Sequence, residues 1–66
     1  MFDIRRGEQV RVKTDIVRGG FFLLKAGTEG KVITMRKEDN GRPGYLVKWK
    51  KYGMVAVVRS DIERVL

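Results

Sequence analysis

The chain has 66 residues and a net charge of +7 at neutral pH, from 15 Lys and Arg against 8 Asp and Glu, and it contains neither cysteine nor histidine. This length predicts one domain, residues 1–66, and a domain near this size buries only about 60% of the surface that its unfolded chain exposes. The missing residue types exclude disulfides and Cys-based zinc sites, and they remove the commonest metal ligand and general base. We therefore expect no metal, no cofactor and no enzyme activity.

The first residues are not expected to form a targeting signal. Met1–Arg6 lacks an apolar core segment, and no apolar run in the chain approaches the roughly 20 residues of a membrane span. We expect a cytoplasmic protein without a membrane segment.

Positive charge is concentrated in one part of the chain. Between Lys31 and Lys51, seven basic residues stand against two acids, a net charge of +5. Such a field attracts polyanions or an acidic protein partner. The alternative interpretation is that the charge only keeps a small protein soluble.

The chain begins with alternating residues. Phe2 and Ile4 alternate with charged neighbours, so the first six residues are a candidate addition to a sheet edge. Gln9–Thr14 alternates strictly, which predicts a strand with Val10 and Val12 facing inward.

Asp15–Ala26 is the longest segment predicted to be irregular, with a flexible turn at Gly19-Gly20. The four apolar residues after this turn cannot all face one way in an extended chain. We expect some of them to close one end of the core and the rest to stay partly exposed. The exposed part is a candidate protein-docking patch, with a homodimer as its simplest partner. The four residues are Phe21, Phe22, Leu23 and Leu24.

A turn, a strand and a hairpin loop come next. The glycines at both ends of Gly27–Gly30 supply unusual φ angles. Apolar residues on both faces of Lys31–Arg36 predict a central strand. The loop Glu38–Gly44 contains Asn40-Gly41, the strongest short-range hairpin signal.

The stretch Gly44–Tyr52 predicts a strand that holds the only Trp and both Tyr residues. The period of two gives it an inner face with Trp49 and an outer face with Lys48 and Lys50. If this alternation holds, Trp49 packs in the core, as the single Trp of a small domain usually does. The alternative is an exposed Trp49 among the lysines.

The chain ends with two short strands on either side of a helical turn. Met54–Val58 is continuously apolar and predicts a strand. Ser60–Glu63 predicts a single helical turn with Ser60 as its N-cap. Arg64–Leu66 is the predicted last strand.

Together these elements predict an all-β fold, a single barrel of about five antiparallel strands with one short helical turn before the last strand. Its core is expected to contain Val10, Val12, Val32, Val47, Val55, Val57 and Ile62.

Three stretches, Gly7–Val12, Gly27–Val32 and Ser60–Val65, give the chain a pattern that resembles the SH3-like small β-barrel. In this respect it is similar to the small barrel protein of photosystem I, the ferredoxin–thioredoxin reductase variable chain, and KOW-type and chromo-type barrels. The resemblance implies the fold and leaves the function open, because barrels of this kind serve many functions.

Tyr45–Tyr52 resembles the "Y-L-V-K-W-K-G-Y/F" stretch of chromodomains, where the Trp and the aromatic residue three positions later form two walls of a methyl-lysine cage. These positions are Trp49 and Tyr52 here. Lys51 replaces the glycine, and a cage among three lysines would repel a cation. We interpret this similarity as convergence on a strand that suits a small barrel.

Gly44–Leu66 also resembles the end of a plasmid-borne dihydrofolate reductase, whose active pore depends on a "V-Q-I-Y" strand. The matching Val55–Val58 reads V-A-V-V. The Gln and Tyr are missing, so we do not expect this activity.

The sequence favours non-enzymatic nucleic-acid binding, with DNA or RNA as the partner and little base specificity. Cations neutralise phosphates, and an exposed aromatic ring stacks on a base. The candidate residues are Arg36, Lys37, Arg42, Lys48, Trp49, Lys50, Lys51 and Tyr52. The alternative function is a protein-interaction or regulatory subunit that docks on an acidic partner protein. One contiguous basic face would favour the first function, and an exposed apolar patch beside the charge would favour the second.

Overall fold

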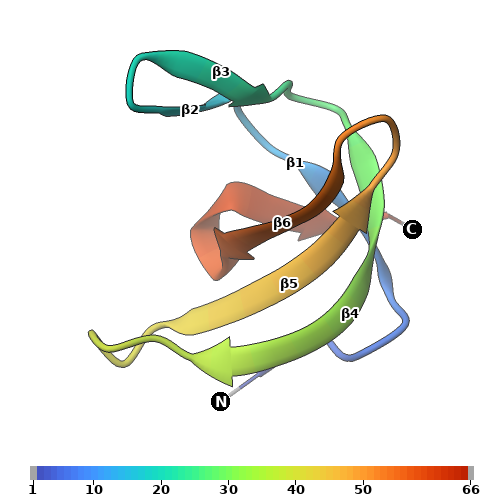
Figure 1. The fold of residues 1–66 in the computed structure, drawn as a ribbon. Coiled ribbons are helices and arrows are strands. Elements are labelled where there is room, and N and C mark those ends of the chain that lie inside the picture. The colour runs from blue at the N-terminus through green and yellow to red at the C-terminus, as the bar shows by residue number, and fades with distance from the viewer. Residues whose placement is uncertain (1, 66) are drawn as a thin grey trace.

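Short strands account for most of the chain (Figure 1). The computed structural model describes residues 2–65, and the side chain of Phe22 lies outside what it describes. The strands are β1 (Gln9–Val12), β2 (Ile16–Arg18), β3 (Phe21–Leu24), β4 (Glu29–Lys37), β5 (Pro43–Trp49), β6 (Gly53–Val58) and β7 (Ile62–Arg64). One 3-10 turn, η1 (Arg59–Asp61), stands before the last strand. The predicted all-β fold is thus confirmed.

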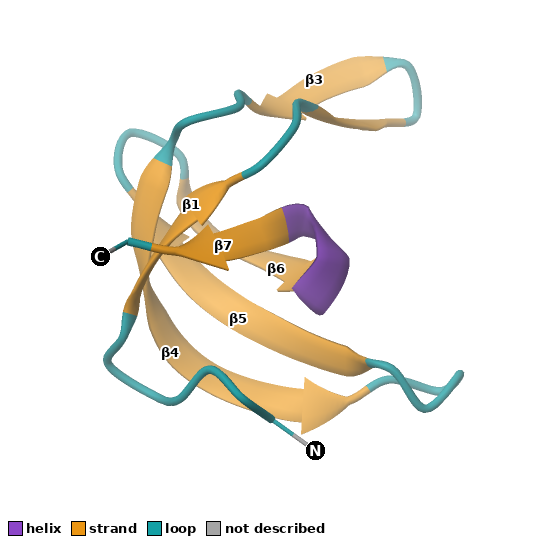
Figure 2. Cartoon of the chain, turned by 180° about the vertical axis from the view of Figure 1, so that it is seen from behind, coloured by secondary structure: helices purple, strands orange, loops and turns teal. Residues whose placement is uncertain are grey.

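Five of the strands form one antiparallel sheet in the order β6-β5-β4-β1-β7. The sheet is strongly curved, so β1 and β7 lie across the core from β5 and β6, as the two opposite views show (Figures 1 and 2). The Asn40-Gly41 turn joins β4 to β5, with Gly41 at a φ of 81°. The sequence predicted this hairpin correctly.

Alternating residues of the strands fill one core. The predicted core residues are all buried except Val55, which is half-buried and packs against the others. The buried hydrophobic residues are Ile4, Val10, Val12, Ile16, Leu24, Val32, Tyr45, Val47, Trp49, Val57 and Ile62. The side chains of this core therefore come from both halves of the curved sheet.

The N-terminal segment covers one end of this core without forming a strand. Ile4 is fully buried, and the ring of Phe2 packs edge-on against Tyr45 with a centroid distance of 5.9 Å. The Gly7 N–H donates to the carbonyl of Val32 at 2.8 Å. The interpretation of this segment as an addition to a sheet edge is wrong, because the first strand begins at Gln9.

The segment predicted to be irregular contains a two-stranded hairpin, β2–β3, which stands apart from the main sheet (Figure 2). Its turn is Gly19-Gly20, with φ angles of 60° and 81°. At its base Ile16 and Leu24 are buried, so this end belongs to the core. Farther out, the guanidinium of Arg18 donates to the carbonyl of Ala56 on β6 at 3.1 Å.

Several predicted boundaries differ from the structure. β5 ends at Trp49, three residues before the predicted end. The last strand is Ile62–Arg64, and Leu66, which the prediction included, lies outside the described residues. Ser60 is not the N-cap, because η1 begins one residue earlier; the Asp61 side chain instead accepts from the N–H of Val58 at 3.2 Å.

Within residues 2–65, no helix is long and apolar enough to cross a bilayer.

Candidate nucleic-acid interface

The outer face of β4, β5 and β6 carries side chains that point away from the core. Cross-strand register arranges them in rows, because residues directly opposite each other lie on the same face of a sheet. One row is Lys31, Lys48 and Met54; the next is Thr34, Leu46 and Ala56; the third is Arg36, Gly44 and Val58. The outer face thus has cations at both ends and an uncharged middle row.

Lys31 and Lys48 form a like-charge pair on this face. They are directly opposite each other on β4 and β5, and both are exposed. Residues in such positions have their Cβ atoms about 4.5–5.5 Å apart, and like charges there are destabilising. An anion between the two ammonium groups would relieve that repulsion.

Arginine takes part in every side-chain ion pair within residues 2–65, and lysine in none. The pairs are Arg11–Glu63, Arg36–Glu38, Arg59–Asp3 and Arg64–Glu8. Four of the eight acidic residues are therefore paired with arginines. Each of the seven lysines is exposed and has no carboxylate partner in the described part of the chain.

The β4–β5 hairpin carries three of the predicted site residues. Lys37 and Arg42 are exposed near its tip. Arg36 is also exposed, but its Nε donates to the Glu38 carboxylate at 3.3 Å, which offsets part of its charge. The Glu38 side chain lies over Gly44, where a Cβ would come within 3.0 Å of it.

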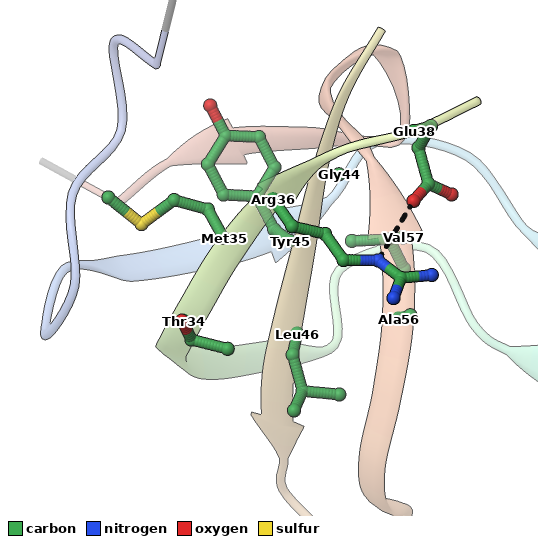
Figure 3. A pocket seen from close by; sticks show the side chains of 9 residues that line it. All are labelled: Thr34, Met35, Arg36, Glu38, Gly44, Tyr45, Leu46, Ala56 and Val57. Atoms are coloured by element: carbon green, nitrogen blue, oxygen red, sulfur yellow. Dashed lines mark hydrogen bonds and ion pairs between the residues drawn. The ribbon is translucent and has the colours of Figure 1, made fainter. Parts of the chain in front are cut away.

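A pocket of about 270 Å³ opens on the outer face beside this ion pair. Arg36 and Glu38 border one end of it, and Leu46 lies at the other (Figure 3). Thr34 and Ala56, from the neighbouring strands, also line it. An apolar hollow therefore separates Arg36 from the Lys31–Lys48 pair, so the predicted cations do not form one contiguous face.

Lys50, Lys51 and Tyr52 lie at the opposite end of β5, in the turn to β6. At about 3.3 Å per residue, the seven-residue strand separates this turn from the β4–β5 hairpin by about 20 Å. Tyr52 is 46% exposed. The predicted site thus divides into a hairpin group and a turn group, with Lys48 between them.

Trp49 has to be removed from the candidate site. Its side chain is 2% exposed, and its indole N–H donates to the carbonyl of Val55 at 3.2 Å. The period of two along β5 places it in the core with Tyr45 and Val47. A base cannot stack on a ring buried in this way.

The candidate docking patch is divided between core and surface. Leu24 is buried, Leu23 packs against the core, and Phe21 is 77% exposed. Phe22 was part of this prediction, but its side chain lies outside the described residues. Val17, on the partner strand of the hairpin, is also exposed.

Two cations next to the predicted site were not among its predicted residues. Lys31 is the cross-strand partner of Lys48, and its own strand, with apolar residues on both faces, gave no signal for its direction. Lys25 lies in the turn before β4 and comes near Lys50 and Lys51 through folding, for which the sequence has no local signal.

The shifted pKa values belong to a different part of the molecule. Hydrogen bonds from Arg59 lower the pKa of Asp3 to about 2. The Arg5 backbone N–H, with help from Arg64, lowers the pKa of Glu8. Burial raises the pKa of Tyr45. These groups hold the N-terminal segment in place, so their shifts have a structural cause.

Among the described residues, no group of three or more acidic side chains is placed to hold a metal ion. Comparison with known proteins found no family model that matches the chain, and neither a curated protein nor a solved structure that is significantly similar to it.

Proposed function

We propose that this protein is a non-enzymatic module that binds nucleic acid, mainly through contacts of lysine side chains with the phosphate backbone. The observation that carries the proposal is the Lys31–Lys48 pair, two exposed like charges held opposite each other without a carboxylate between them. Folding brings these two charges together, and their repulsion destabilises the folded state. Bound phosphates would replace that repulsion by attraction. We also propose that the fold belongs to the SH3-like barrels, on the basis of its strand order and its 3-10 turn before the last strand.

The cations do not form the one contiguous basic face that would have favoured this function most. Lys37 and Arg42 at the hairpin, and Lys50 and Lys51 at the far turn, extend the positive potential in separate groups beyond the central pair. No base-reading group is required for this mode, so sequences are bound with similar affinity.

The test is a titration with a labelled DNA duplex at several salt concentrations. Each phosphate contact contributes about −0.9 to the slope of log affinity against log salt on duplex DNA. Replacing both Lys31 and Lys48 by Gln is therefore expected to flatten the slope by nearly two, by about the same amount for unrelated sequences.

A matched control replaces Arg6 and Lys13 by Gln, two exposed cations outside the proposed surface, which gives the same net charge. This control is expected to keep most of the wild-type slope. Equal slopes for the two double variants would reject the sheet face as the binding surface. A wild type that binds the duplex as weakly as the Lys31→Gln, Lys48→Gln variant at low salt would reject the function.

Docking on an acidic partner protein is the second candidate, and one observation favours it. Phe21 and Val17 are exposed on the β2–β3 hairpin, and Arg18, the cross-strand partner of Phe21, donates to the carbonyl of Ala56 on β6. Exposed apolar surface beside positive charge is typical of a protein-binding site. The titration separates the two functions, because a surface built for a protein partner leaves the oligonucleotides unbound at low salt.

A further inference from the structure

Two turns meet at the end of the barrel opposite the β4–β5 hairpin and border a hollow of about 470 Å³. One is the turn before β4, with Lys25 and Thr28, and the other is the β5–β6 turn. The backbone N–H of Lys50 donates to the carbonyl of Glu29 at 3.1 Å and ties the two turns together. We call this hollow the turn pocket; residues 25–29 and 50–52 line it.

The turn pocket is cationic, and its charges are not compensated by ion pairs. Its three lysines outnumber its single carboxylate, that of Glu29. None of these four groups takes part in a side-chain ion pair within residues 2–65. An anionic group in the hollow would therefore meet ammonium groups that are not already committed.

The backbone of the β5–β6 turn adds a second observation. Lys51 has a φ of 72°, the only positive φ of a non-glycine residue in the described part of the chain. Residues other than Gly, Asn and Asp pay a steric cost in this region, and such residues cluster at ligand sites. Glycine would avoid that cost at this position. The residue at the rim of the pocket is nevertheless a lysine.

Tyr52 gives the pocket an aromatic surface. Nearly half of it is exposed, whereas the core aromatics Tyr45 and Trp49 are almost completely buried. An aromatic side chain beside lysines matches a nucleotide, because the base stacks on the ring and the phosphates contact the ammonium groups. The carboxylate of Glu29 is an acceptor for the exocyclic amino groups that three of the four DNA bases carry.

We infer that the turn pocket binds an unpaired nucleotide, so that single-stranded nucleic acid is the ligand at this end of the barrel. The inference rests on the proposed function and specifies its ligand. Base pairs in a duplex are stacked on their neighbours and cannot lie on Tyr52 without being flipped out, which costs a few kcal/mol. DNA and RNA share the base and the phosphate, so both are tested.

The experiment measures binding of the full chain to labelled single-stranded DNA, to RNA of the same sequence and to the matching DNA duplex. Replacing Tyr52 by Ala is expected to weaken single-strand binding about 5- to 150-fold, the range for loss of one stacked base. The loss on the duplex is expected to be several-fold smaller. Tyr52→Phe keeps the ring and is expected to retain most of the single-strand affinity.

Phe21→Ala is the matched control, because Phe21 is the other strongly exposed aromatic in the described residues and lies on the distant β2–β3 hairpin. It is expected to leave single-strand binding within about twofold of wild type. If Tyr52→Ala has no larger effect than this control, or weakens the duplex as much as the single strand, the inference is wrong.

Inorganic polyphosphate as a competitor tests whether the pocket recognises phosphate alone. If polyphosphate displaces the single strand equally well from wild type and from Tyr52→Ala, and the two bind the strand equally, the pocket is only an anion site. A different result would reject the proposed function itself: neither the duplex nor the single strand would bind to the wild type at low salt. Duplex binding that depends on Lys31 and Lys48 but not on Tyr52 would overturn the pocket alone.

Discussion

At the scale of single residues, Asp3 connects the N-terminal segment to the rest of the molecule. Its carboxylate accepts from Nε of Arg59 at 2.9 Å and 3.1 Å, from Nη2 of Arg59 at 3.0 Å, and from the hydroxyl of Tyr45 at 3.3 Å. Its backbone carbonyl also accepts from Arg64. One residue thus joins the first segment of the chain to β5, η1 and β7.

These contacts predict a dependence of stability on pH. Because Arg59 lowers the pKa of Asp3 from 3.8 to about 2, ionised Asp3 stabilises the folded state. This contribution is fully present above the pKa of the unfolded chain, near 4, and is lost as the pH falls toward 2. Asp3→Asn is therefore expected to lower the melting temperature at pH 7 and to have a smaller effect at pH 2.

Thermal unfolding of wild type, Asp3→Asn and Asp39→Asn at pH 7, 4 and 2 measures this difference. Asp39 is an exposed acid of the hairpin turn and serves as the matched control, with little effect expected at any of these pH values. A gap between wild type and Asp3→Asn that stays constant from pH 7 to pH 2 would contradict a role for ionised Asp3.

The sequence could not predict this network. Asp3 and Arg59 are 56 positions apart, and only folding of the intervening strands brings them together. Alternation did predict that Val10 and Val12 of β1 face inward, because that depends only on neighbours along the chain. Local patterns therefore indicated burial, whereas the polar partners depended on the tertiary fold.

At the scale of secondary-structure elements, Gly30 on β4 leaves the space that the Trp49 ring of β5 occupies. The sequence suggested a turn residue with an unusual φ, but Gly30 lies within β4, directly opposite Trp49. A Cβ at this position would lie 2.7 Å from Trp49 Cε3, 2.7 Å from a methyl group of Val47 and 2.8 Å from the carbonyl oxygen of Lys48. The indole ring occupies the space that a side chain at position 30 would need.

Gly30→Ala is therefore expected to destabilise the protein by about 1–3 kcal/mol, the usual cost of overpacking a core. The clash includes a backbone oxygen and the buried Trp49, so it cannot be relieved by moving one flexible side chain. The midpoint of urea unfolding, followed by Trp49 fluorescence, measures the change.

Gly44→Ala is the matched control in the paired strand. Neither glycine has a positive φ, and the added methyl group at Gly44 would meet only the movable side chain of Glu38, at 3.0–3.1 Å. We expect a change well below that of Gly30→Ala. Equal losses from the two variants would mean that replacing glycine in these strands, and not the contact with Trp49, causes the destabilisation.

The elements also differ in how well their sequence predicted them. The Asn40-Gly41 turn followed from turn chemistry, and β4 followed from apolar residues on both of its faces, although it begins before and ends after the predicted Lys31–Arg36. The β2–β3 hairpin was missed because the adjacent apolar residues of Ile16–Arg18 and Phe21–Leu24 show no alternation. β5 was predicted to run to Tyr52, but Lys51 adopts a turn conformation that its residue type does not indicate.

At the scale of the whole molecule, the distribution of charge was predicted less well than the core. The sequence placed seven basic residues in one segment, and the fold distributes them between a hairpin, a sheet face and a turn about 20 Å from that hairpin. The core depends on the period of each strand, which can be seen in the sequence. The arrangement of the surface depends on which strands become neighbours.

The size of the molecule makes its core sensitive to a single charge. Stability of roughly 0.05–0.15 kcal/mol per residue amounts to about 3–10 kcal/mol for a chain of this length. An unpaired charge in the core costs several kcal/mol, which is a similar amount. Val57 is 2% exposed and belongs to the single core cluster, and Ala56 next to it points to the exposed outer face.

Val57→Asp is therefore expected to unfold the whole domain, whereas Ala56→Asp is expected to stay folded. The two variants introduce the same carboxylate one position apart on β6, so they differ only in the face of the sheet that receives it. Far-UV circular dichroism and the emission maximum of Trp49 report folding, since the indole is buried in the native state. A cooperatively folded Val57→Asp variant with wild-type Trp49 emission would mean that β6 does not close this core.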